Sequence, residues 1–376
     1  MVQKIPYVDV ASKMNEWYSM IRENKVTDAE FLRAEIQREI DEMEEDQTVL
    51  AYYSLIDLRH KIMLKDLKPN QAIDIKDSLK EIELKKEEIE KENQVDEMIN
   101  YYSWFFKGMY EFKQKNFNTA ITCYKIAEQK LSTVTDEIER AEFNYKMAEI
   151  YYHLNQNHLS MNYATMALDT FKAYATLKEK EIFCYFVIAG NQLDCMRYED
   201  ALEPFQKALN EAKELNSGYL LASAYFNVGN CYFYLNEFSE AYENIKRSLG
   251  IIENFSHKPK AIFQLMYVCI KQKNYTEALK LYEEGILSAK AFDDKQHEAQ
   301  LNILKGVYLN ESDHKLVESG FDYLESKSLY ADVEELAIDA ATYYNENGRL
   351  EESTKFFQKG ILARIQIKRG DVLYEK

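Results

Sequence analysis

The sequence has few residues that interrupt helices: only 4 of its 376 residues are proline and 11 are glycine. All-β folds and doubly wound α/β folds need many tight turns, and tight turns depend on these two residues. The chain is instead rich in Ala, Leu, Glu, Lys, Met and Gln, which favour helices. We therefore expect an all-α protein. Its length exceeds what one hydrophobic core usually serves, which predicts two domains or an elongated array.

Cysteines are also few, and their number and spacing argue against a disulfide framework and against a zinc site. They are odd in number, widely separated and without a C-x-x-C pair, unlike a disulfide framework or a zinc site. Each lies in an apolar helical stretch, so we expect small core residues at all of these positions. The five are Cys123, Cys184, Cys195, Cys231 and Cys269.

Long apolar runs are missing as well. No stretch of about 18 apolar residues occurs, and residues 1–6 lack the apolar segment of a signal peptide. We therefore expect no membrane insertion, no export and a cytoplasmic location. A formal net charge of -17 disfavours attraction to nucleic acid or to anionic membrane surfaces. The apolar share of 46% is nevertheless ample for a folded core.

Signatures of a self-contained active site are absent too. The chain has no G-x-x-x-x-G-K-[ST], no G-x-G-x-x-G after a strand, no H-E-x-x-H and no G-x-S-x-G. Its 6 histidines form no pair at i, i+3 or i, i+4. We expect neither a metal site nor a cofactor of the chain's own.

Three segments near the N-terminus do show apolar residues at helical spacing. Thr27 followed by Glu30 is a capping-box pattern, and either Asp46 or Thr48 is a suitable cap for the third segment. Short connections predict an antiparallel three-helix bundle over residues 1–67. The three segments are residues 7–24, 27–45 and 48–66.

A break follows the bundle at Pro69, because proline restrains the preceding residue from the α region. We place a linker at residues 68–77. The strongly charged stretch over residues 77–93 is typical of a solvated helix that leads into the next domain.

Beyond the linker, a pattern of small and aromatic residues recurs six times. Tetratricopeptide hairpins carry small residues where their paired helices approach closely. The period of about 40 residues exceeds the usual ~34, which implies longer helices with the same packing. One degenerate copy is expected between residues 300 and 324. We predict a right-handed tetratricopeptide-repeat superhelix over residues 78–376, in preference to a bundle without repeats. The small residues that open the second helices are Ala120, Ser160, Ala201, Ala241, Ala278 and Ser353.

The first helices of stacked hairpins line a concave groove. Carboxamides there can hold a peptide backbone with a donor and an acceptor, and carboxylates can pair with a cationic side chain. Any one of these residues is equally well explained as a solvated or helix-to-helix contact, but their convergence on one face predicts a peptide-binding groove. The predicted peptide-binding residues are Glu149, Tyr152, Phe183, Asp194, Asn227, Asn230 and Gln264.

The run E-E-D-Q at residues 44–47 lies between the second and third predicted helices. From physical chemistry alone, a charged loop that caps the third helix is the favoured interpretation. A functional role for this run needs further support.

Seven longer motifs supply it: N-E-W-Y at 15–18, M-E-E-D-Q at 43–47, Y-Y-S-L at 52–55, R-H-x-x-M-L at 59–64, Y-Y-x-x-F-F-x-G-M-Y-E at 101–111, Y-x-D-A-L at 198–202 and L-Y-A-D-V-E at 329–334. Together they resemble the Rap family of Bacillus response-regulator aspartate phosphatases and regulators. The resemblance covers nearly the whole chain.

The resemblance implies that the bundle binds a response regulator and that the repeats bind a short inhibitory signalling peptide, a Phr peptide that is secreted and reimported. It marks Gln47 as the catalytic residue, which enters the regulator's active site, and it places Mg²⁺ on the regulator. It also marks Asp194 and Asn227 as residues that hold the peptide. The implied regulator-binding residues are Glu45, Asp46, Leu50, Leu55 and Leu58.

Two functions remain open at this point. One is a peptide-inhibited phosphatase that hydrolyses the aspartyl phosphate of a phosphorelay response regulator in sporulation control, with Gln47 positioning the attacking water. The other is a noncatalytic regulator that sequesters a DNA-binding response regulator or activator, in competence or mobile-element control. Neither involves direct contact with nucleic acid or membrane, and a homodimer is compatible with both.

Overall fold

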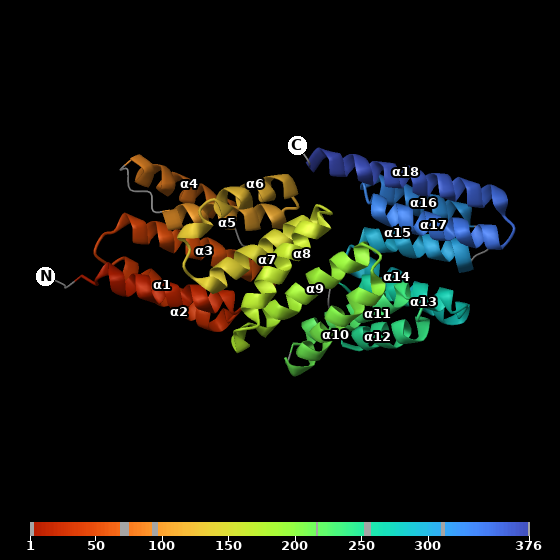
Figure 1. The fold of residues 1–376 in the computed structure, drawn as a ribbon, viewed down its shortest axis with the longest axis horizontal. Coiled ribbons are helices and arrows are strands. Elements are labelled where there is room, and N and C mark those ends of the chain that lie inside the picture. Colours follow the sequence, from red (N-terminus) through yellow and green to blue (C-terminus); the bar gives the residue numbers. More distant parts are fainter. Residues whose placement is uncertain are drawn as a thin grey trace. The chain divides into compact units, whose positions relative to one another are not determined.

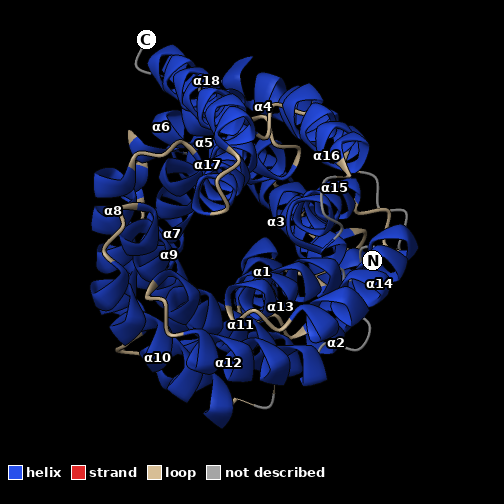
Figure 2. Ribbon diagram, turned by 90° about the vertical axis from the view of Figure 1, so that its right-hand side faces the viewer, coloured by secondary structure: helices blue, strands red, loops and turns tan. Residues whose placement is uncertain are grey.

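The computed structural model describes residues 4–67, 75–91, 97–215, 217–251, 257–309 and 313–374. Within these ranges every regular element is helical, apart from a single bridge between Ile5 and Met43. Figure 2 shows helices joined by short loops. The all-α prediction is therefore confirmed. None of the described helices is long and apolar enough to cross a membrane.

The chain divides into two compact units, Met1–Lys178 and Glu179–Lys376, whose helices are labelled in Figure 1. The first contains α1 (Tyr7–Arg22), α2 (Val26–Ile40), α3 (Gln47–Leu67), α4 (Lys76–Lys91), α5 (Glu97–Lys113), α6 (Phe117–Glu128), η1 (Leu131–Thr133), α7 (Glu137–His153), α8 (Asn157–Phe171) and η2 (Ala175–Leu177). The second contains α9 (Lys178–Asp194), α10 (Tyr198–Glu214), α11 (Gly218–Tyr234), α12 (Phe238–Ile251), α13 (Lys258–Lys271), α14 (Tyr275–Ala291), α15 (Lys295–Leu304), η3 (Lys305–Leu309), α16 (His314–Ser326), α17 (Tyr330–Glu346) and α18 (Leu350–Tyr374).

The three predicted N-terminal helices are present as α1, α2 and α3. In α1 the buried side chains recur every three or four residues, so one face enters the core. Trp17 lies on this face, and its indole Nε1 donates to Nδ1 of the buried His60 at 2.9 Å. The capping box predicted at Thr27 is wrong, because α2 begins at Val26 and its N-cap is Lys25, without a side-chain hydrogen bond.

The core of the first unit continues from the bundle into the repeats. Helix α3 packs against α4 and α5 as well as against α1 and α2, so the apolar cluster runs without interruption from Val10 to Leu154. The boundary between the compact units therefore lies at Lys178, after the second hairpin. The functional division at residues 67 and 78 stays a prediction, and residues 68–74 of the predicted linker lie outside the described residues.

Helical hairpins follow one another along the repeats, and the paired helices approach closely at small residues on both helices. A Cβ added to Gly108 would lie 2.5 Å from the ring of Tyr124, and one added to Gly229 would lie 2.6 Å from Cγ1 of Ile245. Such contacts are shorter than packed side chains tolerate, so only glycine fits at these crossings. The tetratricopeptide prediction is confirmed.

The degenerate copy predicted between residues 300 and 324 is the hairpin formed by α15 and α16. Val317 occupies the place where the other hairpins have a small residue on the second helix. The first element compensates with Gly306, because a Cβ there would lie 2.5 Å from Cγ2 of Val317. A larger residue therefore stands at the position by which the other copies are recognised, which hides this copy in the sequence.

The hairpin turns share one backbone feature that reproduces the repeat period. Six of the hairpins have a turn residue in the left-handed region, where a non-glycine residue is uncommon and asparagine is favoured. This residue closes the first helix and directs the chain into the second. These residues are Lys115, Asn155, Met196, Asn236, Lys273 and Gly348, with φ between 55° and 73°.

The cysteine prediction holds at four positions and fails at one. Cys123, Cys184, Cys231 and Cys269 are buried. Cys195 is exposed, because it follows the end of α9 and lies in the turn before α10.

Candidate functional site

The turn before α3 carries the predicted catalytic segment, and it is held from both sides. Met43 is buried in the bundle core. The N–H of Ile5 donates to the carbonyl oxygen of Glu42 at 3.0 Å, and the N–H of Glu44 donates to the carbonyl oxygen of Ile5 at 2.9 Å. The turn is thus fixed to the N-terminal segment and to the core, while Glu44 faces solvent.

Asp46 and Gln47 have different roles at the start of α3. The Asp46 carboxylate accepts the N–H of Val49 at 2.9 Å, so Asp46 caps the helix. Gln47 is exposed, and its Nε2 donates to Oε1 of Glu45 at 3.1 Å. This hydrogen bond orients the carboxamide on the surface, where its oxygen can accept and its second N–H can donate.

The apolar part of the predicted partner surface needs a correction. Leu55 and Leu58 have no exposed area and belong to the apolar cluster that α3 forms with the helices packed around it. They belong to the core and cannot contact a partner in this conformation. Leu50 is half-buried and remains a candidate. Phe31 on α2, which was not among the predicted contact residues, is 67% exposed.

A buried polar network joins α1 of the bundle to α5 and α7. The hydroxyl of Tyr18 donates to Oε2 of Glu139 at 2.6 Å, and that of Tyr101 donates to Oε1 at 3.0 Å. Arg22 pairs with Asp136 at 2.6 Å and lies 3.6 Å from Glu139. Complete burial raises the pKa of the Glu139 carboxyl to about 7, although the tyrosine hydrogen bonds and Arg22 oppose this. Two of the sequence motifs, at residues 15–18 and 101–111, thus meet at one carboxyl group.

In the second unit, three of the predicted peptide-binding carboxamides lie on consecutive first helices. Asn227 and Asn230 on α11 are half-buried, and Gln264 on α13 is buried with an Nε2 that has no hydrogen-bond partner. A buried donor without a partner costs about 1–3 kcal/mol, so Gln264 would gain from a ligand carbonyl. Phe183 is half-buried on α9, and Asp194 is exposed at the end of that helix.

The acidic face of α17 contacts the helices that carry these carboxamides and was not predicted. Tyr234 donates its hydroxyl to Glu335 at 3.0 Å, Gln296 donates to Asp332 at 2.7 Å, and Lys271 pairs with Asp339. Burial raises the pKa of both Asp332 and Glu335. These contacts join α17 to α11, α13 and α15. The L-Y-A-D-V-E motif gave no sign of them, because the partners are distant in the sequence.

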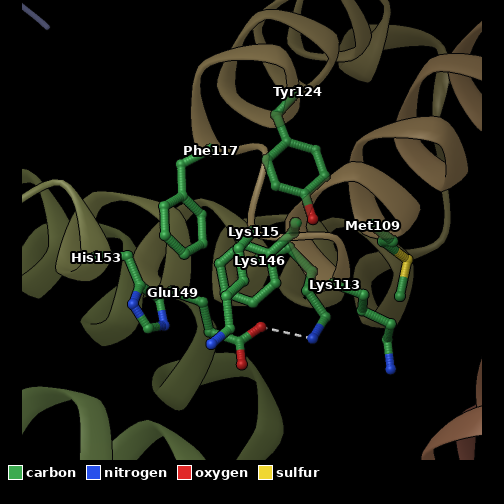
Figure 3. Close-up of a pocket in the computed structure, with 9 residues that line it drawn as sticks. Met109, Lys113, Lys115, Phe117, Tyr124, Lys146, Glu149 and His153 are labelled. Carbon is green, nitrogen blue, oxygen red and sulfur yellow. Dashed lines mark hydrogen bonds and ion pairs between the residues drawn. The ribbon is translucent and has the colours of Figure 1, made fainter. Parts of the chain in front are cut away.

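The other two predicted peptide-binding residues, Glu149 and Tyr152, lie on α7 in the first unit. The Glu149 carboxylate is already engaged, because Lys146 pairs with it at 2.5 Å and Tyr145 donates to it at 3.0 Å. Glu149 also lines a pocket between α5, α6 and α7, shown in Figure 3. Tyr152 is half-buried and contacts His153 edge to face.

The fold and these sites define a tetratricopeptide-repeat protein with an N-terminal helical bundle that presents a carboxamide on a capped turn. Comparison with known families identifies both parts. Residues 4–65 match the model for the N-terminal part of response regulator aspartate phosphatase H, and residues 222–255 match a tetratricopeptide repeat. The chain belongs to the Rap family of Bacillus response regulator aspartate phosphatases and regulatory proteins.

Relatives from Bacillus subtilis (strain 168) cover nearly the full length. The chain is 41% identical to response regulator aspartate phosphatase I over 99% of this chain and 95% of the relative. It is 35% identical to regulatory protein RapF over 97% of each chain. Among solved structures, a Rap protein complexed with competence and sporulation factor is 38% identical and superimposes with a TM-score of 0.82, covering 97% of this chain and 100% of that one.

Proposed function

We propose that this chain is a peptide-regulated phosphatase that hydrolyses the aspartyl phosphate of a response regulator, with Gln47 as the residue that positions water. The observation that carries the proposal is the Gln47 carboxamide, exposed at the start of α3 and oriented by Glu45. Relatives named as aspartate phosphatases cover the whole chain, which supports the reaction class.

The proposed reaction needs little covalent chemistry from this chain. A water oxygen attacks phosphorus in line, the bond from phosphorus to the aspartyl oxygen breaks, and inorganic phosphate leaves a free carboxylate. A carboxamide can accept a hydrogen bond from that water and donate another to a phosphoryl oxygen, so it positions the nucleophile. The Mg²⁺ ion that balances the phosphoryl charge would be held by the response regulator.

The bundle surface around Gln47 supplies the proposed contacts to the regulator. Glu45 orients the carboxamide, Asp46 fixes the start of α3, and the half-buried Leu50 lies one turn further along the helix. Phe31 adds an exposed aromatic side chain of the kind that anchors protein interfaces.

The repeats are proposed to bind a short inhibitory peptide. In the second unit Asn227, Asn230 and Gln264 offer donors and acceptors for a peptide backbone, and Asp194 offers a carboxylate for a cationic side chain. Solved relatives include a Rap protein with competence and sporulation factor, which supports a peptide ligand. Peptide inhibition, sporulation control and a cytoplasmic location are part of this proposal.

A second candidate function is noncatalytic sequestration of a DNA-binding regulator. It is favoured by relatives named as regulatory proteins, RapF and RapC, at 35% and 36% identity. In this alternative the same bundle surface binds the partner, and Gln47 serves only as a contact residue.

A phosphotransfer assay against a panel of phosphorylated response regulators separates the two functions. The phosphatase proposal expects many turnovers of one regulator at a substoichiometric amount of this chain. Stoichiometric loss of DNA binding by a regulator, without phosphate release, would instead establish sequestration.

A further inference from the structure

A pocket of about 350 Å³ lies between the first hairpin, α5 and α6, and the helix α7. We call it the lysine pocket. Its volume falls in the range of small-molecule sites. The proposed phosphatase reaction does not use it. The lining residues, all drawn in Figure 3, are Met109, Phe112, Lys113, Lys115, Phe117, Tyr124, Lys146, Glu149 and His153.

The lysine pocket is cationic in a protein whose formal net charge is -17. Three lysines line it, with Glu149 as the single carboxylate. Lys113 is half-buried, and burial together with nearby Lys146, Arg59 and Lys65 lowers its pKa to about 7. Like charges held close together in a partly desolvated site create a potential that favours an anion.

The pocket also contains a fully buried polar group without a partner. Tyr124 has no exposed area, and its hydroxyl oxygen makes no hydrogen bond. Figure 3 shows the hydroxyl directed into the pocket, toward the side chains of Lys113 and Lys146. Gly108 allows this position, because any Cβ there would meet the Tyr124 ring. Buried hydroxyls are normally satisfied, so this one is suited to donate to a bound acceptor.

The opposite wall is aromatic. Phe117 stacks on His153 with ring centroids 4.9 Å apart, and Phe112 contacts both rings at 5.5 Å and 5.1 Å. This wall offers apolar surface beside the charged groups. A ligand with an anionic end and an apolar body would therefore match the pocket better than a small inorganic anion.

We propose that the lysine pocket binds a carboxylate carried on an apolar group, with Lys113, Lys146 and Tyr124 contacting the carboxylate and the aromatic wall contacting the apolar group. When the ligand binds, the Lys146 ammonium, which pairs with Glu149 in the free chain, is shared between Glu149 and the ligand carboxylate. The inference does not depend on phosphatase activity, because binding alone tests it.

The test titrates the full chain with N-acetyl-L-leucine and with its neutral analogue N-acetyl-L-leucinamide, using ligand-observed NMR at pH 6.5. The expected result is that the acid binds at least about tenfold more tightly than the amide, as charge-assisted hydrogen bonds require. Lys113→Met should weaken binding of the acid about tenfold, and Tyr124→Phe about threefold to tenfold. Lys113→Arg should retain most of the affinity.

Lys125→Met is the matched control, because Lys125 is exposed on α6 and does not line the pocket. It should leave the affinity unchanged. Equal affinity for acid and amide, unchanged binding in Lys113→Met or absence of binding to wild type would each overturn the proposal. Binding of inorganic phosphate without binding of N-acetyl-L-leucine would overturn the assignment to a carboxylate.

Discussion

The buried carboxyl group of Glu139 predicts a specific dependence of stability on pH. Its pKa in the folded chain is about 7, compared with an ordinary value of 4.5. Between pH 4.5 and about 7 the folded state binds more protons at this group than the unfolded state does. The contribution of Glu139 to the free energy of unfolding is therefore largest below pH 4.5 and falls as the pH rises through 7. The difference corresponds to roughly 3 kcal/mol, because each pH unit of difference is worth about 1.4 kcal/mol.

Glu139→Gln isolates this contribution. The glutamine oxygen can accept from one tyrosine and its amide can donate to the other, so Tyr18 and Tyr101 stay satisfied while the titrating group is removed. Urea unfolding of both proteins between pH 5 and pH 8 gives two stability profiles. Wild type should lose about 2–3 kcal/mol more than the variant over this range, because a small part of the effect lies below pH 5. Parallel profiles would refute the assignment of a raised pKa to this carboxyl group.

Two further predictions concern the repeats. Asn227→Ala should weaken binding of a selected penta- to hexapeptide by about 1.5–3 kcal/mol in calorimetry, because its hydrogen bonds to the peptide backbone are lost. Asn210 is exposed, so Asn210→Ala is the control and should leave the affinity unchanged. An unchanged affinity in Asn227→Ala as well would count against this role. Gly229→Ala should reduce the free energy of unfolding by about 1–3 kcal/mol, because the added Cβ clashes with Ile245. A Cβ added to Gly250 meets no atom within 4 Å, so Gly250→Ala should raise the free energy of unfolding by about 1 kcal/mol. Equal effects of the two glycine substitutions in urea unfolding would contradict the close packing at Gly229.

The repeats were predictable because each hairpin repeats the same local requirement. Small residues such as Ala120 and Ala241 are needed where two helices approach, and these residues are visible in the sequence. The hairpin of α15 and α16 was only located approximately, because Val317 stands where the other hairpins have a small residue.

The surface of the bundle was harder to predict than its helices. Leu55 and Leu58 fit an amphipathic pattern, but their burial depends on how many helices surround α3, and the number of helices packed against α3 was not visible in local spacing. Similarly, the hydrogen bond from Tyr18 to Glu139 joins residues 121 positions apart. The sequence motifs marked Tyr18 as distinctive without indicating its partner.

The central claim is that Gln47 positions the attacking water, and Gln47→Asn tests it most directly. The substitution keeps the carboxamide but withdraws it by one methylene, a displacement that can reduce a water-positioning effect about a hundredfold. Gln114→Asn is the matched control, because Gln114 is exposed in the turn between α5 and α6. With a regulator that wild type dephosphorylates, Gln47→Asn should bind with unchanged affinity and release phosphate about a hundredfold more slowly, while Gln114→Asn should match wild type. Phosphate release at the wild-type rate, or loss of binding together with activity, would contradict a catalytic role for Gln47.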